Sequence, residues 1–244
     1  MKTFLSVIYL IVIFIPIFLL ATILTALSAI IGCLCGKRSF WGYIPPRYWG
    51  KVACRLALCR VKVRTEVELD PNQSYVFVAN HQGAFDIFLI YGYLGTKTKW
   101  VQKQSLRKIP LVGKACEVIG HVYVDNSSPR AIKRTIDKAK RELEDGVSMT
   151  IFPEGSRTST GKMGKFKKGA FVIAEDMHLP IVPLTLNGPI EVMKIGSYMI
   201  NLGKKLELVI HKPIETEGLT DEKKAELMNK TRDVIYSDLW DKYK

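Results

Sequence analysis

The amino-terminal part of the chain is a long uncharged run, and it limits the possible folds more than any other feature. From Thr3 to Gly36 there is no Asp, Glu, Lys or Arg. This uncharged run is longer than the roughly 20 residues that a helix needs to cross a bilayer core. A cleaved signal peptide is the alternative, but its apolar region is about 7 to 15 residues long. We therefore expect a helical membrane anchor. Pro16 leaves open whether the anchor spans the bilayer or dips in and returns.

The positive charge is concentrated next to this apolar run. Residues 1–65 contain nine Lys and Arg residues and no Asp or Glu, which leaves only four units of the net charge of +13 for the rest of the chain. Anionic lipid headgroups attract such a cluster, and the positive-inside tendency places it in the cytoplasm. Nucleic acid is the alternative partner for a pI near 9.5, but the downstream residues show no basic stripe on a recognition helix. We expect anionic lipid and no nucleic acid.

The segment after the apolar run predicts a second helix that lies in the membrane interface. Pro45 and Pro46 precede the sequence RYWGKVACRLALCR, which has the pattern of a basic amphipathic helix. Interfacial aromatic anchors are expected at Trp41, Tyr43, Tyr48 and Trp49. We predict two parts: residues 1–60 as a membrane-associated helical segment, and residues 61–244 as an α/β domain. The expected location is a membrane with this domain on the cytoplasmic face, the inner membrane if the cell is bacterial.

The five cysteines do not indicate a metal centre or a disulfide framework. Their number is odd, they form no pair of CxxC motifs, and four of them lie in or beside the membrane segment. We interpret them as small apolar residues and predict no metal.

Beyond residue 60, short apolar runs alternate with helical patterns. Strands are expected at 61–67, 76–79, 98–103, 121–125, 147–152, 181–186 and 205–211. Helices are expected after residue 86, between 128 and 146, and near 169–178 and 220–240. This alternation predicts an α/β fold, in which helices flank a mixed, mostly parallel sheet and functional groups lie at the carboxyl ends of strands.

The sequence YVFVANHQGAFD places an imidazole and a carboxylate at such a strand end. His81 follows the run Val76–Ala79, and Asp86 begins an apolar helical pattern. Side chains five positions apart on one helix would point about 140° away from each other, but a turn with the freedom of Gly83 can bring them together. They form a candidate base and its orienting carboxylate. The alternative is a polar turn in which Asp86 only complements a helix amino terminus.

A second polar loop follows the expected strand at 147–152. It contains Glu154, Gly155, Ser156 and Arg157, followed by two further glycines and four lysines up to residue 168. A flexible cationic loop with a guanidinium suits a phosphorylated substrate, because Arg offers a bidentate fork and backbone amides add donors. The spacing is neither that of a P-loop nor that of a GxSxG hydrolase. A solvated basic loop is the alternative.

Together these segments resemble the glycerolipid acyltransferases, specifically the 1-acyl-sn-glycerol-3-phosphate acyltransferases, over about residues 70–190. NHQGAFD resembles the HX4D motif of that family, and FPEGSRT resembles its FPEGTR motif, with Ser156 for the usual Thr. In KQSLRKIPLVG, Lys103 precedes a Leu-Pro-Gly pattern, and LPIVPL resembles the last, proline-containing motif. One position departs from the family pattern. The family usually has an Arg associated with phosphate binding where this sequence has Asn126. Arg130, Lys103 or Arg157 could take that role.

The resemblance implies an α/β acyltransferase domain at residues 61–244 with catalytic His81 and Asp86. His81 would accept the proton of the sn-2 hydroxyl of 1-acyl-glycerol-3-phosphate as this hydroxyl attacks an acyl thioester, giving phosphatidic acid. Phosphate binding would fall to Lys103, Glu154, Gly155, Ser156 and Arg157. The donor would be acyl-CoA or acyl carrier protein, and no cofactor or metal is implied. The alternatives are another acceptor (glycerol-3-phosphate, a lysophospholipid or a lyso-aminolipid) or a lipid-binding module without turnover. The sequence indicates no oligomeric state.

Overall fold

A seven-stranded sheet forms the centre of the molecule. The computed structural model describes residues 2–125, 128–143, 146–197, 199–216 and 221–244. The strand order is β1-β7-β6-β2-β5-β3-β4, and only the β6–β7 pair is antiparallel. The strands are β1 (Arg60–Thr65), β2 (Val76–Ala79), β3 (Thr98–Lys103), β4 (Val122–Val124), β5 (Ser148–Ile151), β6 (Ile181–Asn187) and β7 (Lys205–Ile210). The predicted mixed, mostly parallel sheet flanked by helices is confirmed.

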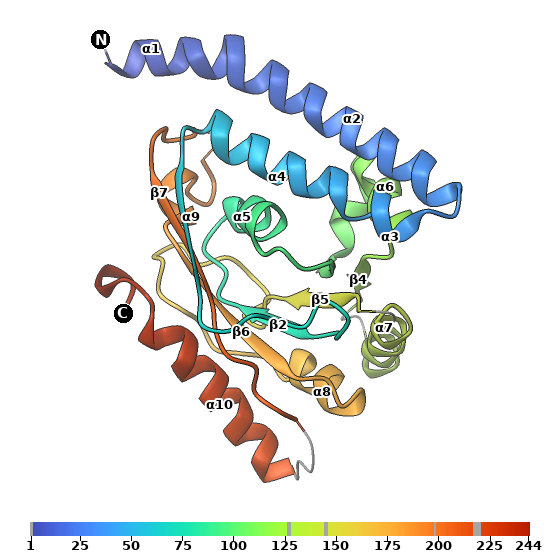
Figure 1. The fold of residues 1–244 in the computed structure, drawn as a ribbon. Coiled ribbons are helices and arrows are strands. Elements are labelled where there is room, and N and C mark those ends of the chain that lie inside the picture. The colour runs from blue at the N-terminus through green and yellow to red at the C-terminus, as the bar shows by residue number, and fades with distance from the viewer. Residues whose placement is uncertain (1, 126–127, 144–145, 198, 217–220) are drawn as a thin grey trace.

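Helices cover both faces of this sheet (Figure 1). One face carries α4 (Ile44–Leu56) and α5 (Phe85–Tyr93), and α2 (Ile15–Leu34) lies outside them. The other face carries α7 (Pro129–Arg141), α8 (Gly169–Asp176) and α10 (Asp221–Ser237). Successive residues of β2 join the two cores, because Phe77 packs with the first group and Val76 and Val78 with the second. This burial on both faces explains why β2 reads as a continuous apolar run.

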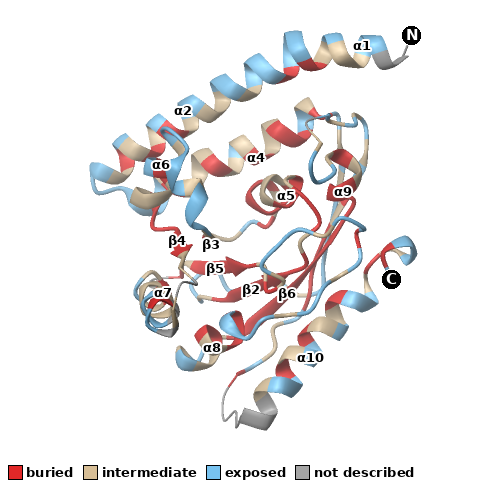
Figure 2. Cartoon of the chain, turned by 180° about the vertical axis from the view of Figure 1, so that it is seen from behind, coloured by how far each residue is buried: buried red, intermediate tan, exposed pale blue. Residues whose placement is uncertain are grey.

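The amino-terminal apolar run is one long helix. It consists of α1 (Lys2–Tyr9), a π-helical turn η1 (Leu10–Phe14) and α2, with Pro16 as the second residue of α2. Residues Phe4–Leu34 have the length and composition of a membrane-spanning helix, with a mean hydropathy of 3.0 over their most apolar part. After α3 (Arg38–Trp41), α4 runs back beneath it (Figure 1). The helix does not turn back on itself. Its outer surface is largely exposed (Figure 2) and apolar, as membrane association requires.

Helix α4 is the predicted amphipathic basic helix, but Trp49 on it does not have the expected position of a lipid anchor. The indole of Trp49 donates to Thr22 Oγ1 at 2.8 Å, and its ring stacks on Phe18 with centroids 5.9 Å apart. Trp49 therefore joins α4 to α2 instead of serving as a lipid anchor. The next residue, Gly50, lets α4 approach α5 closely, since a Cβ there would lie 2.6 Å from the Phe88 carbonyl oxygen.

Besides α3, three short elements were absent from the sequence expectations: η2 (Gln104–Lys108), α6 (Val112–Ile119) and α9 (Pro189–Val192). A further short turn, η3 (Asp241–Tyr243), follows α10. Helix α6 packs against α2, where Ala115 and Ile119 contact Ala26 and Ala29. The apolar helix is therefore attached to the α/β layers through α4 and α6. The division of the chain at residue 60 stays a prediction.

A buried histidine gives this fold a specific sensitivity to acid. His121 Nδ1 accepts the Trp100 backbone N–H at 3.3 Å, so Nε2 carries the ring proton and donates to the Tyr91 hydroxyl at 2.6 Å. Burial, together with the charges of Lys99 and Arg38, lowers the pKa of His121 from 6.5 to about 3. Because the unfolded chain binds this proton and the folded chain does not, stability present above pH 6.5 is lost as the pH falls.

We expect the free energy of unfolding to decrease by about 1.4 kcal/mol per pH unit below about pH 6 through this residue. Thermal unfolding in detergent at about pH 7.5 and about pH 5 would measure it. His121→Asn should be less stable overall but less sensitive to pH, whereas the exposed control His178→Asn should keep the wild-type sensitivity. An equal pH dependence in wild type and His121→Asn would contradict the assignment.

Candidate active site

The predicted histidine and carboxylate meet at the carboxyl end of β2. His81 Nδ1 lies 2.6 Å from Asp86 Oδ2, and the two side chains are 16% and 0% exposed. Because an ionised carboxylate only accepts hydrogen bonds, the imidazole must donate through Nδ1–H. Its Nε2 then carries the lone pair, and Nε2 has no hydrogen-bond partner within the described ranges. This is the tautomer that a general base needs.

The position of Asp86 suits an orienting carboxylate. It lies in the first turn of α5, where the helix dipole favours negative charge. Its Oδ2 accepts the Gly83 N–H at 2.9 Å in addition to the imidazole proton. Its Oδ1 is buried without a hydrogen-bond partner in the described part of the chain. The turn between His81 and Asp86 is therefore closed by the carboxylate itself, which excludes the alternative that Asp86 only complements a helix terminus.

The loop after β5 is fastened directly to the histidine. Glu154 Oε1 accepts the His81 backbone N–H at 2.8 Å, and Oε2 accepts the Gly164 N–H at 2.7 Å. The His81 carbonyl in turn accepts the Thr158 N–H at 3.1 Å. Burial raises the pKa of the Glu154 carboxyl, while the Gly164 and His81 amides partly counter this by stabilising the ionised form. Glu154 thus joins the two strand-end motifs, which follow the neighbouring strands β2 and β5.

On its other side the histidine turn is fastened to the end of β6. Asn80 makes a two-way pair with Leu186, whose carbonyl oxygen accepts from Nδ2 at 2.9 Å and whose N–H donates to Oδ1 at 2.8 Å. Gln82 is fully buried and accepts the Gly188 N–H at 3.1 Å. The residues on both sides of His81 are therefore fixed to residues at the end of β6, which lie 106 positions later in the sequence.

An aromatic stack supports the imidazole ring. Phe152 lies parallel to His81, with ring centroids 3.9 Å apart and an interplanar angle of 11°. Trp100 also stacks on Phe152, with ring centroids 5.6 Å apart. Contact with an aromatic face stabilises a cation, so this stack suits an imidazole that becomes positively charged during the reaction.

The remaining predicted site residues lie at the same edge of the sheet. Lys103 is the last residue of β3, and the exposed segment Gly155–Arg157 follows β5. Because β2, β5 and β3 are parallel neighbours, their carboxyl ends lie at one edge. The Lys103 and Arg157 side chains have no hydrogen-bond or ion-pair partner among the residues that the structure describes. Both cations are therefore available to an anionic ligand.

Glu154 and Gly155 each have a structural part in this loop. Both carboxylate oxygens of Glu154 accept hydrogen bonds from backbone N–H groups. The carboxylate therefore acts as a brace, that is, it holds two backbone segments together. Gly155 has φ of +73°, and a Cβ there would lie 2.8 Å from Lys167 Nζ; the loop thus requires glycine for its own conformation. A direct contact of Gly155 or Ser156 with phosphate stays a prediction. Asn126 lies outside the described residues.

We expect Glu154→Gln to weaken this brace. An amide has one acceptor oxygen, so it can satisfy only one of the two N–H donors, and leaving the other unsatisfied costs about 1–3 kcal/mol. Thermal unfolding should show this loss, and kcat should fall because His81 is held less firmly. The control is Glu226→Gln on the exposed side of α10. A Glu154→Gln protein with wild-type stability and kcat would show that the brace is unimportant.

Comparison with known proteins finds similarity to acyltransferases. A family model described as Acyltransferase matches residues 60–187. A chloroplastic 1-acyl-sn-glycerol-3-phosphate acyltransferase of Brassica napus is 37% identical over 160 residues, which are 63% of this chain and 46% of that protein. The 1-acyl-sn-glycerol-3-phosphate acyltransferase of Saccharomyces cerevisiae is 29% identical over 216 residues, which are 87% of this chain and 71% of the yeast protein.

A solved structure extends the similarity beyond the matched family region. The crystal structure of the 1-acyl-sn-glycerophosphate acyltransferase PlsC from Thermotoga maritima has a TM-score of 0.67 and 26% sequence identity, and the match covers 90% of this chain and 93% of that one. The chain spans less than half the length of the plant relatives that it matches, 46% for Brassica napus and 39% for Arabidopsis thaliana.

Proposed function

The chain belongs to the acyltransferase family, and from this premise we propose that it makes phosphatidic acid from 1-acyl-glycerol-3-phosphate and an acyl thioester. The observation that carries the proposal is the hydrogen bond between His81 Nδ1 and Asp86 Oδ2, which leaves Nε2 as a free base at the edge of the sheet. The named relatives in Brassica napus and Saccharomyces cerevisiae support the same reaction.

The reaction proceeds by direct transfer. His81 Nε2 takes the proton of the sn-2 hydroxyl while the hydroxyl oxygen attacks the thioester carbonyl carbon, and Asp86 stabilises the resulting imidazolium. Collapse of the tetrahedral intermediate breaks the carbon–sulfur bond, and the imidazolium returns the proton to the leaving thiolate. General-base help of this kind is worth about 10² to 10⁴ in rate. The substrate hydroxyl takes the part that serine has in a hydrolase triad, so the protein forms no acyl intermediate.

Substrate binding follows from the charges and from the apolar helix. Lys103 and Arg157 are exposed cations at the edge that carries His81, and they would hold the acceptor phosphate. Acyl-CoA and acyl carrier protein are the proposed donors, and the transfer needs no cofactor. The helix at Phe4–Leu34 keeps the protein at the membrane, where acceptor and product reside. The basic residues beside it favour a location of the α/β layers on the cytoplasmic face.

The test is a competition among acceptors in detergent micelles. A labelled acyl-CoA or acyl-carrier-protein thioester is offered together with 1-acyl-glycerol-3-phosphate, glycerol-3-phosphate and lysophosphatidylcholine, and the lipid products are separated. We expect the label predominantly in phosphatidic acid. Label in a different product would replace the proposed acceptor while keeping acyl transfer. Absence of transfer to every acceptor would favour a lipid-binding module.

Arg157→Ala is expected to raise the acceptor KM by about tenfold or more, with a smaller effect on kcat. A hydrogen bond to a charged group contributes about 1.5–3 kcal/mol, and the phosphate is distant from the reacting carbon. Initial rates at varied acceptor and varied thioester concentrations separate the two constants. Arg134→Ala, on the exposed side of α7, is the control. If the acceptor KM stays fixed and only thioester saturation changes, Arg157 does not bind the phosphate.

A further inference from the structure

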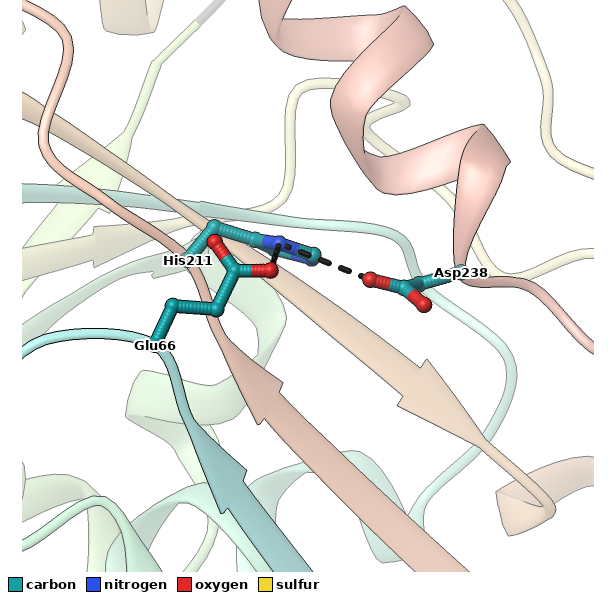
Figure 3. A group of neighbouring side chains, drawn as sticks. All are labelled: Glu66, His211 and Asp238. Carbon is teal, nitrogen blue, oxygen red and sulfur yellow. Dashed lines mark hydrogen bonds and ion pairs between the residues drawn. The ribbon is translucent and has the colours of Figure 1, made fainter.

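A second group of ionisable side chains lies on the α10 side of the sheet, separated from His81 by strand β6. Glu66 directly follows β1, His211 directly follows β7, and Asp238 directly follows α10. Figure 3 shows the two carboxylates on either side of the imidazole. His211 Nδ1 lies 3.0 Å from Glu66 Oε1 and 3.6 Å from Asp238 Oδ2. One donor atom from each residue lies within 4.8 Å of the other two.

The tautomer of His211 is determined by its other nitrogen. Thr185 Oγ1 donates its single proton to the Ile235 carbonyl oxygen at 3.1 Å, because a carbonyl can only accept. The same Oγ1 lies 2.8 Å from His211 Nε2 and must therefore accept a proton from it. A neutral imidazole with a proton on Nε2 has a bare lone pair on Nδ1. His211 is 98% buried, and this lone pair faces two carboxylate oxygens, an arrangement that requires a positive charge between them.

Two occupants can supply that charge, a second proton or a metal cation, and the distances favour the cation. A proton on Nδ1 would bond to Glu66 but leave Asp238 Oδ2 beyond hydrogen-bonding distance. Tetrahedral zinc bound at about 2.0–2.1 Å separates its ligand atoms by about 3.3–3.4 Å, and the observed 3.0 and 3.6 Å lie on either side of this value. Both distances to Nδ1 therefore suit a shared cation, and the two carboxylate oxygens lie within 4.8 Å of each other.

The surroundings of the three donors also resemble those of a metal site. A metal-binding histidine almost always donates its second ring N–H to a fixed acceptor, as His211 does to Thr185. The other oxygen of each carboxylate is already bonded, Glu66 Oε2 to the Lys212 N–H at 3.2 Å and Asp238 Oδ1 to the Arg64 guanidinium. One oxygen of each thus remains directed at Nδ1. Arg64 offsets one carboxylate charge, and the exposed Glu66 leaves the site open to solvent.

We propose that Glu66, His211 and Asp238 bind one divalent cation of the zinc class, which clamps the end of α10 to the ends of β1 and β7. Imidazole nitrogen and carboxylate oxygen are ordinary zinc ligands, and three of them leave a fourth position for water. The cation takes no part in acyl transfer. Its function is to hold the carboxyl-terminal helix on the sheet.

The test uses the tag-free full chain in detergent, stripped of metal with a chelator and titrated with Zn²⁺. We expect one Zn²⁺ per chain and a higher Tm with Zn²⁺ than without it. Glu66→Gln and His211→Gln should each weaken binding by about tenfold or more and remove the rise in Tm. Glu66 is exposed, so its variant remains informative if His211→Gln does not fold. His178→Gln, at an exposed histidine after α8, should bind as the wild type does.

Binding of Co²⁺ identifies the ligands independently. Nitrogen and oxygen ligands give visible bands without a thiolate charge-transfer band, whereas the five free cysteines would give one. Three results would overturn the proposal: no saturable binding, binding that survives both Glu66→Gln and His211→Gln, or a thiolate band. A nitrogen NMR spectrum that shows His211 doubly protonated in the absence of bound Zn²⁺, even when Zn²⁺ is supplied, would identify the proton as the occupant instead.

Discussion

His81→Ala is expected to reduce acyl transfer by at least about 10² to 10⁴ in kcat, the contribution of a positioned general base. The substitution removes Nε2 and leaves the backbone bonds of residue 81 to Glu154 and Thr158 available. We therefore expect a folded protein that still associates with membranes. Steady-state transfer from a labelled thioester measures kcat, and thermal unfolding with vesicle sedimentation establishes folding and membrane association.

His178→Ala is the matched control, because His178 is exposed after α8, on the opposite face of the sheet from α5. Its kcat should equal that of the wild type. Substantial transfer by a folded His81→Ala protein would show that another group accepts the proton.

Asp86→Asn is expected to reduce kcat severely, by up to about 10⁴, as an incorrect imidazole tautomer does in a serine protease triad. If the Asn amide nitrogen faces His81, it donates to Nδ1 and forces the proton onto Nε2, which then cannot act as a base. If the Asn oxygen faces His81, the negative charge that stabilises the imidazolium is lost. Its amide nitrogen would then occupy the buried position of Oδ1, which has no partner in the described structure.

The control for Asp86→Asn is Asp233→Asn, a change at a carboxylate on α10 whose side chain is 75% exposed. Initial rates for both variants at saturating substrates isolate kcat. Unchanged turnover in a folded Asp86→Asn protein would contradict the orienting role and leave His81 without a defined tautomer.

The sheet and the contact between His81 and Asp86 were predictable from the sequence because their signals are local. Strand β3 begins and ends where expected, at Thr98 and Lys103. Ser128 begins α7 as predicted, since its side chain accepts the Ala131 N–H at 3.2 Å. Alternation and caps are read within a few residues. His81 and Asp86 belong to one turn, so their spacing was enough to suggest their contact.

Features that depend on distant residues could not be predicted in this way. Trp49 has the composition of a lipid anchor, but Thr22 and Phe18 on another helix determine where its indole lies. The contact of Glu154 with the backbone N–H of a residue 73 positions away could not be predicted either. No spacing rule connects positions at such separations. The eight-residue α6 was missed because Pro110 and Leu111, the latter with φ of +60°, interrupt the pattern before it.

The cluster of Glu66, His211 and Asp238 shows the same limit. Glu66 and His211 are 145 residues apart, and the pairing of β1 with β7 brings them together. Phe152 is a partial exception, because it directly follows β5 beside the polar loop. An aromatic residue at the end of a strand next to the turn of His81 could have suggested the stack on the imidazole.

The stoichiometry of the reaction tests the central claim most directly. The purified wild-type protein is supplied with acyl-CoA and 1-acyl-glycerol-3-phosphate in mixed micelles, and the released thiol and the phosphatidic acid are both quantified. Direct transfer with His81 as the base predicts one phosphatidic acid for each thiol released, and a rate of formation of both products that is at least about 10²-fold lower with His81→Ala. Thiol release without phosphatidic acid would indicate hydrolysis, and phosphatidic acid formed equally by His81→Ala would refute the proposed mechanism.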